Sequence, residues 1–242
     1  MTELDWSRFD AVLLDLDGTM IDTLGDFVAA LNRMLADLPP PFAHATLLAR
    51  DVERLIGKGS EHLIRAVLVK VQSDHAGAPS AAANAAQTDL NALYQLAWAR
   101  YQHHYSAVNG SFARVYPGVL RGLQQLQSSG KRLACLTNKP TAFAHSLLKT
   151  KGLAEFFDVV YGGDAFERRK PDPLPLLKAC EALGTPAQRT LMVGDSSNDA
   201  QAARAAGCAV WLVRYGYNHG EPIETVPADG YLDSLDQLLA AA

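Results

Sequence analysis

The sequence predicts an α/β fold in which a parallel sheet carries helices on both faces and an all-helical segment follows the first strand. Three observations support this prediction. Short apolar runs recur along the chain, segments with helical spacing separate them, and strand signals vanish between about residues 23 and 110. Parallel strands need crossover connections, and helices between strands supply them. With 242 residues, 48% of them apolar, the chain can bury a substantial core.

The predicted strands are short apolar runs bounded by polar residues, a pattern typical of strands buried on both faces. In chain order they are residues 9–15, 132–137, 157–161, 190–195 and 209–213. Helical stretches alternate with the later strands, at residues 118–127, 141–150 and 199–206. We therefore assign residues 1–22 and 111–242 to one core domain.

Residues 23–110 are predicted to form a separate helical domain. Apolar residues recur there at spacings of three and four, in the segments Phe27–Leu38, Leu63–Val71 and Leu90–Tyr101. Residues 76–87, of which 7 are alanine, are typical of a helix-forming segment without a chemical role.

Composition excludes several classes of protein. The 22 Lys and Arg against 26 Asp and Glu give a formal charge of −4, which offers no basic footprint for nucleic acid. No segment approaches the ~20 apolar residues that span a bilayer, and the acidic start of the chain lacks the pattern of a signal peptide. The three cysteines suit small buried side chains. We expect a cytoplasmic protein without nucleic-acid or membrane partners, either a monomer or a dimer.

Polar side chains follow four of the predicted elements at one edge of the sheet. They occur in the segments Asp15-Leu16-Asp17-Gly18-Thr19, Thr137-Asn138-Lys139, Lys170-Pro171 and Gly194-Asp195-Ser196-Ser197-Asn198-Asp199. In an open parallel sheet, ligands bind beyond the carboxyl ends of the strands. Each segment alone could be an ordinary turn or helix cap, but the four together predict one shared site.

The residue types in these segments suit phosphoryl transfer. Asp15 and Asp195 offer hard oxygen ligands for Mg²⁺, and Lys170 adds a fixed positive charge. The hydroxyl of Thr137 and the backbone amides of the turn that contains Gly18 can hold phosphoryl oxygens. Once its charge is shielded, Asp15 can attack phosphorus. Asp17 can protonate the leaving alkoxide and then deprotonate the attacking water.

These segments resemble the four motifs of the haloacid dehalogenase superfamily, in the same order and spacing. The resemblance covers nearly the whole chain and implies a Rossmann-like core, with the helical insertion as a C1 cap domain. It also implies that Asp15 is the nucleophile and a Mg²⁺ ligand, and that Asp17 is the acid/base with its backbone carbonyl on the metal. Thr137 and Lys170 would hold the phosphate, and Asn138 would bind the substrate. Asp195 would bind Mg²⁺, Asp199 would orient a metal-bound water or Lys170, and Ser196 would lie beside these ligands. The presence of Asp17 disfavours a hydrolytic dehalogenase, because a halide leaves without a proton.

Weaker signals resemble bacterial phosphoglycolate phosphatases. They are the segments 55–60, 116–119 and 215–222, the last of which contains Tyr217 and His219. Lys58 lies between two glycines at a predicted helix N-terminus, which favours binding of an anionic group such as a carboxylate. The resemblance therefore implies a small phosphomonoester substrate, 2-phosphoglycolate, although Lys58 could also be a solvated residue and the Tyr217 loop could only close the crevice.

Several alternatives remain at the level of sequence. Within the superfamily, a sugar-phosphate phosphatase or a β-phosphoglucomutase-like phosphotransferase is the main one. A signalling receiver module also phosphorylates an Asp at a strand end, but it has about half this length and needs no cap. A catalytically silent relative should have lost at least one of Asp15, Asp17, Lys170 and Asp195, and all four are present.

Overall fold

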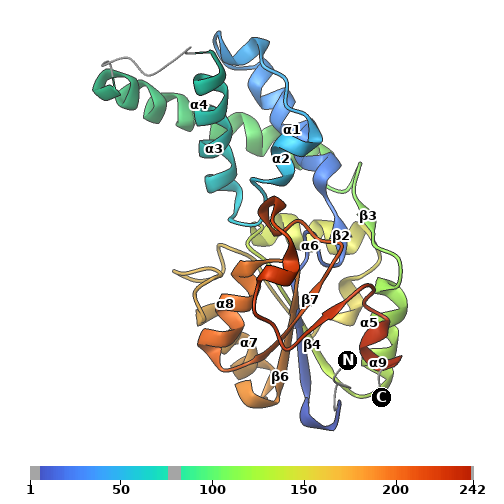
Figure 1. Ribbon diagram of the computed structural model, residues 1–242. Coiled ribbons are helices and arrows are strands. Elements are labelled where there is room, and N and C mark those ends of the chain that lie inside the picture. Colours follow the sequence, from blue (N-terminus) through green and yellow to red (C-terminus); the bar gives the residue numbers. More distant parts are fainter. Residues whose placement is uncertain (1–5, 76–82, 241–242) are drawn as a thin grey trace.

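The computed structural model describes residues 6–75 and 83–240, so the alanine-rich segment 76–87 lies partly outside the described residues. Figure 1 shows a sheet with flanking helices in the lower part of the molecule and a group of helices, α1 to α4, above one end of that sheet. The predicted α/β core with an inserted helical cap is confirmed.

The sheet has six parallel strands in the order β5-β4-β1-β6-β7-β8. Their bounds are β1 Ala11–Leu14, β4 Arg132–Leu136, β5 Val159–Tyr161, β6 Thr190–Gly194, β7 Ala209–Val213 and β8 Gly230–Leu232. The first strand of the chain lies in the middle of the sheet, between β4 and β6. Asp15 follows β1 directly, so its side chain emerges at the centre of the carboxyl edge.

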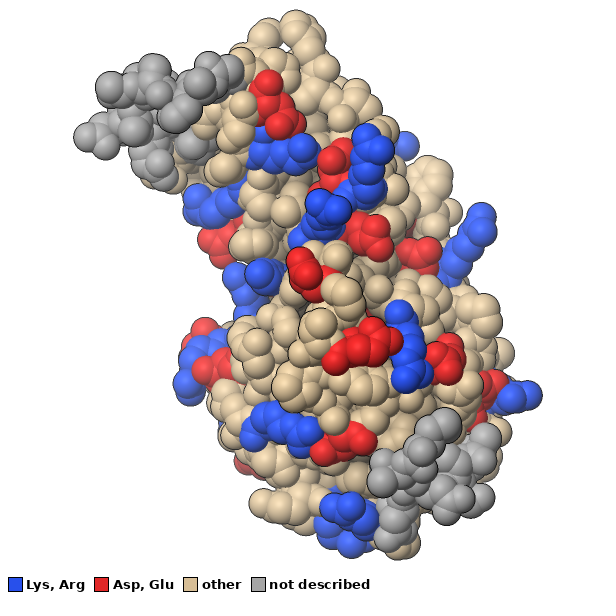
Figure 2. Space-filling model, in the orientation of Figure 1, with Lys and Arg blue, Asp and Glu red and all other residues tan. Residues whose placement is uncertain are grey.

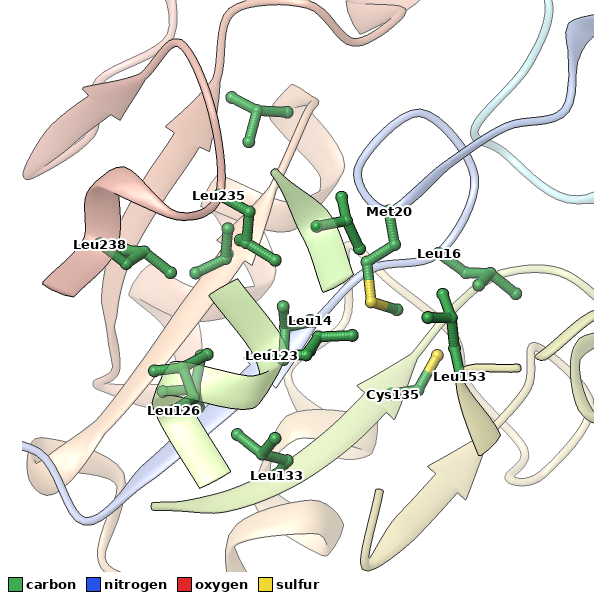
Figure 3. Close-up of a cluster of buried hydrophobic side chains, with 14 of the residues drawn as sticks. Leu14, Leu16, Met20, Leu123, Leu126, Leu133, Cys135, Leu153, Leu235 and Leu238 are labelled. Carbon is green, nitrogen blue, oxygen red and sulfur yellow. The ribbon is translucent and has the colours of Figure 1, made fainter. Parts of the chain in front are cut away.

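Helices cover both faces of the sheet because successive side chains of each strand point to opposite sides. Val12 and Leu14 of β1 belong to the apolar cluster beneath α5 (Val119–Ser128), α6 (Thr141–Thr150) and α9 (Gln237–Ala240), part of which is drawn in Figure 3. Ala11 and Leu13 of the same strand belong to the opposite cluster, with α7 (Leu174–Leu183) and α8 (Ser197–Ala206).

The cap has an apolar core of its own. Four helices form it, α1 (Leu24–Ala36), α2 (Ala49–Glu53), α3 (Ser60–His75) and α4 (Ala83–Val108). The apolar residues that showed helical spacing in the sequence, among them Leu31, Ile64 and Tyr101, are buried together there. Among the described residues, Tyr217 from the loop after β7 is the one buried core-domain side chain in this cluster. The loop after β7 therefore packs against the cap.

A short antiparallel ribbon links the two parts of the chain. It pairs β2 (Ile21–Asp22) with β3 (Arg114–Val115), at the two places where the chain leaves and re-enters the core. The buried carboxylate of Asp26, at the start of α1, accepts hydrogen bonds from the amides of Gly110 (2.6 Å) and Phe112 (2.7 Å). The two segments that connect the core with the cap are therefore hydrogen-bonded to each other.

The remaining elements are single turns of 3₁₀ helix at Trp6–Arg8, Phe42–His44, Ala154–Phe156, Ala187–Arg189, Asn218–Gly220 and Ile223–Thr225. Helices α7 and α9, the ribbon and β8 were not predicted from the sequence. β2 and β3 have two residues each, which is too short for an alternating pattern to show.

Candidate active site

The predicted catalytic residues meet at the carboxyl edge of the sheet, above β1. Lys170 approaches from the loop between β5 and α7, and its Nζ donates hydrogen bonds to Asp15 Oδ1 (2.8 Å) and Asp199 Oδ1 (2.7 Å). A third bond goes to the carbonyl of Leu136 (2.7 Å), at the end of β4. The side chain of Lys170 is only 3% exposed. Three bonds in a buried site fix the ammonium beside the carboxylate that follows β1.

The electrostatics of this pair follow from burial and from charge. Burial alone would lower the pKa of Lys170, but Asp15 and Asp199 together raise it above its ordinary value. Burial raises the pKa of the Asp15 carboxyl to about 7, against the lowering effect of the Lys170 ammonium. The negative charge of Asp199 raises the pKa of Asp15 further. Asp15 therefore lies among more negative charge than one lysine balances.

Asp195 is held between two loops. Its Oδ1 accepts a hydrogen bond from Thr19 Oγ1 (3.0 Å), and its Oδ2 accepts one from the backbone amide of Tyr217 (2.8 Å). Gly18, with a φ of 86°, allows a close approach, because a Cβ on it would lie 2.3 Å from Asp195 Oδ2. Burial, followed by the charges of Asp15 and Asp199, raises the pKa of Asp195 well above its ordinary value.

Asp199 connects these groups at the start of α8. Its Oδ2 accepts hydrogen bonds from the amides of Asp195 (3.2 Å) and Ser196 (3.1 Å) and from Ser196 Oγ (2.7 Å). Ser196 and Asp199 thus form a capping box, which begins α8 at Ser197. Local helix capping therefore fixes the orientation of Asp199 toward Lys170.

Three buried carboxylates, those of Asp15, Asp195 and Asp199, each place an oxygen within 4.8 Å of the others. In the described part of the chain they share one ammonium, that of Lys170, so their negative charge is only partly balanced. Carboxylate oxygens are the ligands that hard divalent cations prefer in proteins. The residues present therefore fit a divalent metal ion.

Asp17 lies outside this cluster and has its own partners. Its Oδ1 accepts hydrogen bonds from Thr23 Oγ1 (2.8 Å) and Lys139 Nζ (2.8 Å), and Lys139 also contacts Oδ2 (3.0 Å). Lys139 lies 4.7 Å from the ring centre of Phe27 and 4.9 Å from that of Tyr105, both cap residues. No role was predicted for Lys139 from the sequence, although its place directly after Thr137 and Asn138 was a signal.

A cavity of about 30 Å³ lies between the core and the cap. The core contributes Asp15, Asp17, Thr137, Asn138, Lys139, Lys170, Ser196, Asn198 and Asp199 to its lining, and the cap contributes Phe27, Ile56, Gly57, Gly59, Ser60 and Leu63. A cavity needs ~10–15 Å³ to hold a single water. The space holds only a few waters, so the cap covers the site closely.

Three core side chains bind one peptide segment of the cap. The carbonyl of Gly57 accepts hydrogen bonds from Asn138 Nδ2 (3.0 Å) and Asn198 Nδ2 (3.1 Å). The carbonyl of Ile56 accepts one from His219 Nδ1 (2.8 Å). We call these three donors and the two carbonyls the latch. They hold the cap segment against the edge of the sheet from which Asp15 emerges.

The loop that carries His219 also reaches the ribbon. The hydroxyl of Tyr217 donates to Asp22 Oδ1 (2.8 Å) and accepts from the amides of Thr23 (2.8 Å) and Leu24 (3.1 Å). Because the amide of Tyr217 also binds Asp195, one residue joins the carboxylate cluster to the start of the cap. The sequence analysis singled out this loop but did not predict these contacts.

The sequence profile of haloacid dehalogenase-like hydrolases matches residues 12–213. The match extends over most of the chain and includes all four segments that meet at the site. The chain belongs to the haloacid dehalogenase-like hydrolase family.

Named relatives of this hydrolase match it over nearly its full length. It is 40% identical over 225 residues to the phosphoglycolate phosphatase of Thiobacillus denitrificans, across 93% of this chain and 92% of that one. It is 44% identical over 230 residues to the phosphoglycolate phosphatase (plasmid) of Cupriavidus necator, across 95% and 91%. The crystal structure of a predicted phosphoglycolate phosphatase from Haemophilus somnus 129pt superposes with a TM-score of 0.84 at 28% identity, covering 96% and 97% of the two chains.

Most of the predicted site residues lie together, but Asp195, Gly18 and Lys58 do not line the cavity. Asp195 still belongs to the carboxylate cluster. Gly18 does not line the cavity, and its amide donates to the carbonyl of Ile21 (2.9 Å). Lys58 is exposed and is also absent from the cavity lining. Its position before α3 agrees with the prediction of a helix start, since α3 begins at Ser60. Burial lowers the pKa of His219, and the positive charge of the nearby Lys58 lowers it further.

Proposed function

We propose that this protein hydrolyses 2-phosphoglycolate to glycolate and phosphate through an aspartyl-phosphate on Asp15. One observation supports the chemistry above all. Asp15 emerges from the central strand into a small cavity, with Lys170 in contact and two further carboxylates beside it. The choice of substrate is supported by the relatives named phosphoglycolate phosphatase, which are 40% and 44% identical over more than nine tenths of the chain.

In this proposal a magnesium ion is held by Asp15, Asp195 and the backbone carbonyl of Asp17. Asp199 and Ser196 keep these ligands in place through the hydrogen bonds described above. When bound, Mg²⁺ supplies positive charge that offsets the carboxylates and the phosphoryl oxygens. The partly balanced charge of the carboxylate cluster supports this assignment.

The residues of the chain then divide the remaining chemistry. Asp15 attacks phosphorus while Lys170 and the Thr137 hydroxyl hold phosphoryl oxygens. Asp17, which enters this step protonated, gives that proton to the leaving alkoxide. In the second step Asp17 takes a proton from water, which attacks the aspartyl-phosphate and releases phosphate. Asn138 fixes the approach of the cap, since its Nδ2 binds both Gly57 and the carbonyl of Lys170 (2.9 Å).

Residues 23–110 act in this proposal as a lid. The cavity is too small to admit a substrate from solution while the latch is made. The chain crosses between the two parts only near residues 22–25 and 108–117, so we place the hinges there. Closure would exclude bulk water from the aspartyl-phosphate and strengthen the charge interactions within the site.

The covered cavity favours a small substrate over a macromolecule. On the face of the molecule shown in Figure 2, Lys and Arg side chains are interspersed with Asp and Glu. Among the described residues, no helix is both long and apolar enough to cross a bilayer. The partner that we propose is a small phosphomonoester, and the location that we propose is the cytoplasm.

A phosphate-release assay tests the function. The purified protein with Mg²⁺ is given 2-phosphoglycolate, an aryl phosphate, glucose 6-phosphate and β-glucose 1-phosphate, and kcat/KM is measured for each. We expect the highest value with 2-phosphoglycolate. A higher value with a sugar phosphate would overturn the substrate assignment. Conversion of β-glucose 1-phosphate to the 6-phosphate without phosphate release would identify a mutase instead.

A further inference from the structure

Lys139 is a buried cation that lines the cavity. Its side chain is 2% exposed, and its Nζ contacts both carboxylate oxygens of Asp17 at 2.8 and 3.0 Å. Phe27 of α1 and Tyr105 of α4 place their rings within 5 Å of the same ammonium. Ring faces attract a cation but supply no countercharge. Within the described residues Asp17 is thus the carboxyl group in contact with Lys139, while the buried Asp26 interacts with it through charge alone.

The other lysines near the site differ from Lys139 in their surroundings. Lys170 already contacts two carboxylates and a backbone carbonyl, and the proposed reaction assigns it to a phosphoryl oxygen. Lys58 is exposed and lies outside the cavity lining. Among the described residues that line the cavity, Lys139 combines burial with contact to a single carboxylate, so its ammonium has capacity for a second anion.

The reach of the substrate places its carboxylate near Lys139. In the proposed reaction, the ester oxygen of 2-phosphoglycolate accepts a proton from Asp17 and therefore lies within hydrogen-bond distance, roughly 3 Å. The carboxylate carbon is two covalent bonds from that oxygen. Lys139 Nζ lies 2.8 Å from Asp17 Oδ1, the oxygen that also accepts a hydrogen bond from Thr23. A substrate carboxylate next to Asp17 is therefore within reach of the Lys139 ammonium.

We propose that Lys139 binds the substrate carboxylate and thereby selects phosphorylated 2-hydroxy acids over phosphomonoesters whose leaving group carries no charge. This inference rests on the proposed function. It transfers to Lys139 the role that the sequence analysis predicted for Lys58. Since Phe27 and Tyr105 belong to the cap, Lys139 has its complete surroundings only when the cap is closed. Carboxylate binding and closure therefore support each other.

The test compares 2-phosphoglycolate with 2-phosphoglycolamide, which has nearly the same shape but no carboxylate charge. The measured quantity is the ratio of kcat/KM for the acid to kcat/KM for the amide. We expect the wild-type protein to favour the acid by about tenfold to hundredfold, the value of one charge-assisted hydrogen bond. Lys139→Met should bring the ratio close to one, and Lys139→Arg should restore part of it.

Two further variants locate the effect. Lys58→Met, at the rival position, should keep the wild-type ratio. Lys149→Met, on the exposed face of α6, controls for the loss of a lysine elsewhere. Because Lys139→Met also removes a partner of Asp17, binding of both compounds is measured by calorimetry in an Asp15→Asn background. The ratio of dissociation constants there does not depend on proton transfer by Asp17.

The outcomes separate the two levels of proposal. If the wild-type protein does not hydrolyse 2-phosphoglycolate, the proposed function fails. If it does, but the ratio survives in Lys139→Met or collapses in Lys58→Met, the role of Lys139 is overturned and the function stands. If Lys139→Met does not fold, the ratios of Lys139→Arg and Lys58→Met decide. A wild-type ratio near one also overturns the role of Lys139.

Discussion

Replacing Asn198 by alanine tests whether the latch controls catalysis. Asn198 donates one hydrogen bond, of 3.1 Å, to the carbonyl of Gly57 in the cap. A hydrogen bond of this kind contributes about 0.5–1.5 kcal/mol. We expect its loss to lower the population of the closed state, and hence kcat/KM for 2-phosphoglycolate, by about twofold to twelvefold. Because Asn198 lies in α8 and alanine favours helix more than asparagine does, part of this loss is offset, and the melting temperature should fall by no more than about 2–4 °C.

A second variant separates closure from direct contact with substrate. Asn198 lines the cavity, but His219 does not, although it donates to the neighbouring carbonyl of Ile56. His219 has a φ of 56°, so glycine can replace it without backbone strain. His219→Gly should therefore reduce kcat/KM by a similar factor, and the double variant by more than either one.

The assay is steady-state phosphate release with Mg²⁺, and thermal unfolding is followed in parallel. Asn91→Ala, an exposed change of the same kind on α4, is the matched control and should behave as wild type. Wild-type kcat/KM in Asn198→Ala and in His219→Gly would refute the reasoning, because the cap would then close without these bonds. A fall confined to Asn198→Ala would indicate contact with substrate rather than a latch.

Three further predictions concern the carboxylate cluster and its neighbours. Asp17→Asn should slow both chemical steps by about 10²–10⁴-fold, measured as kcat, because proton transfer is lost; an unchanged kcat would exclude Asp17 as the acid. Chelation should abolish activity, Mg²⁺ or Mn²⁺ should restore it, and Ca²⁺ should not, because Ca²⁺ prefers six to eight ligands; full activity with Ca²⁺ alone would contradict the site. Lys170→Met should lower the free energy of unfolding of the metal-free protein by about 3–5 kcal/mol, since two buried carboxylates lose their counter-ion. Burial already raises the pKa of Asp15 to about 7 with Lys170 present, so the folded variant binds more protons than the unfolded chain above pH 4. Its urea midpoint should rise as the pH falls from 8 to 5, and a midpoint independent of pH would contradict this account.

The core of the fold could be predicted because its strands are continuous apolar runs, each followed by polar residues. Asp15 and Asp195 follow β1 and β6 directly, so parallel pairing alone brings them to one edge. Secondary structure was harder to predict where a strand is very short, or where it counts as a strand only because it pairs with a neighbour. The ribbon has two residues per strand, and β8 exists as a strand because it pairs with β7.

The side of the site formed by the cap could not be predicted from spacing in the sequence. Lys139 acquires its surroundings from Phe27 and Tyr105, which lie on two different cap helices. The latch depends on how the cap sits over the sheet, since His219 is far along the chain from Ile56. Lys58 was predicted to bind an anionic group because it precedes a helix N-terminus. It does lie before α3, but it does not line the cavity.

Turnover of 2-phosphoglycolate by Asp15→Asn tests the central claim most directly. The amide is nearly isosteric with the carboxylate but is not a nucleophile, and it can still accept the hydrogen bond from Lys170. Thermal unfolding should show an intact fold, and kcat should fall by about 10³-fold or more. Retention of a tenth of the wild-type kcat would contradict the assignment of Asp15 as the group that attacks phosphorus.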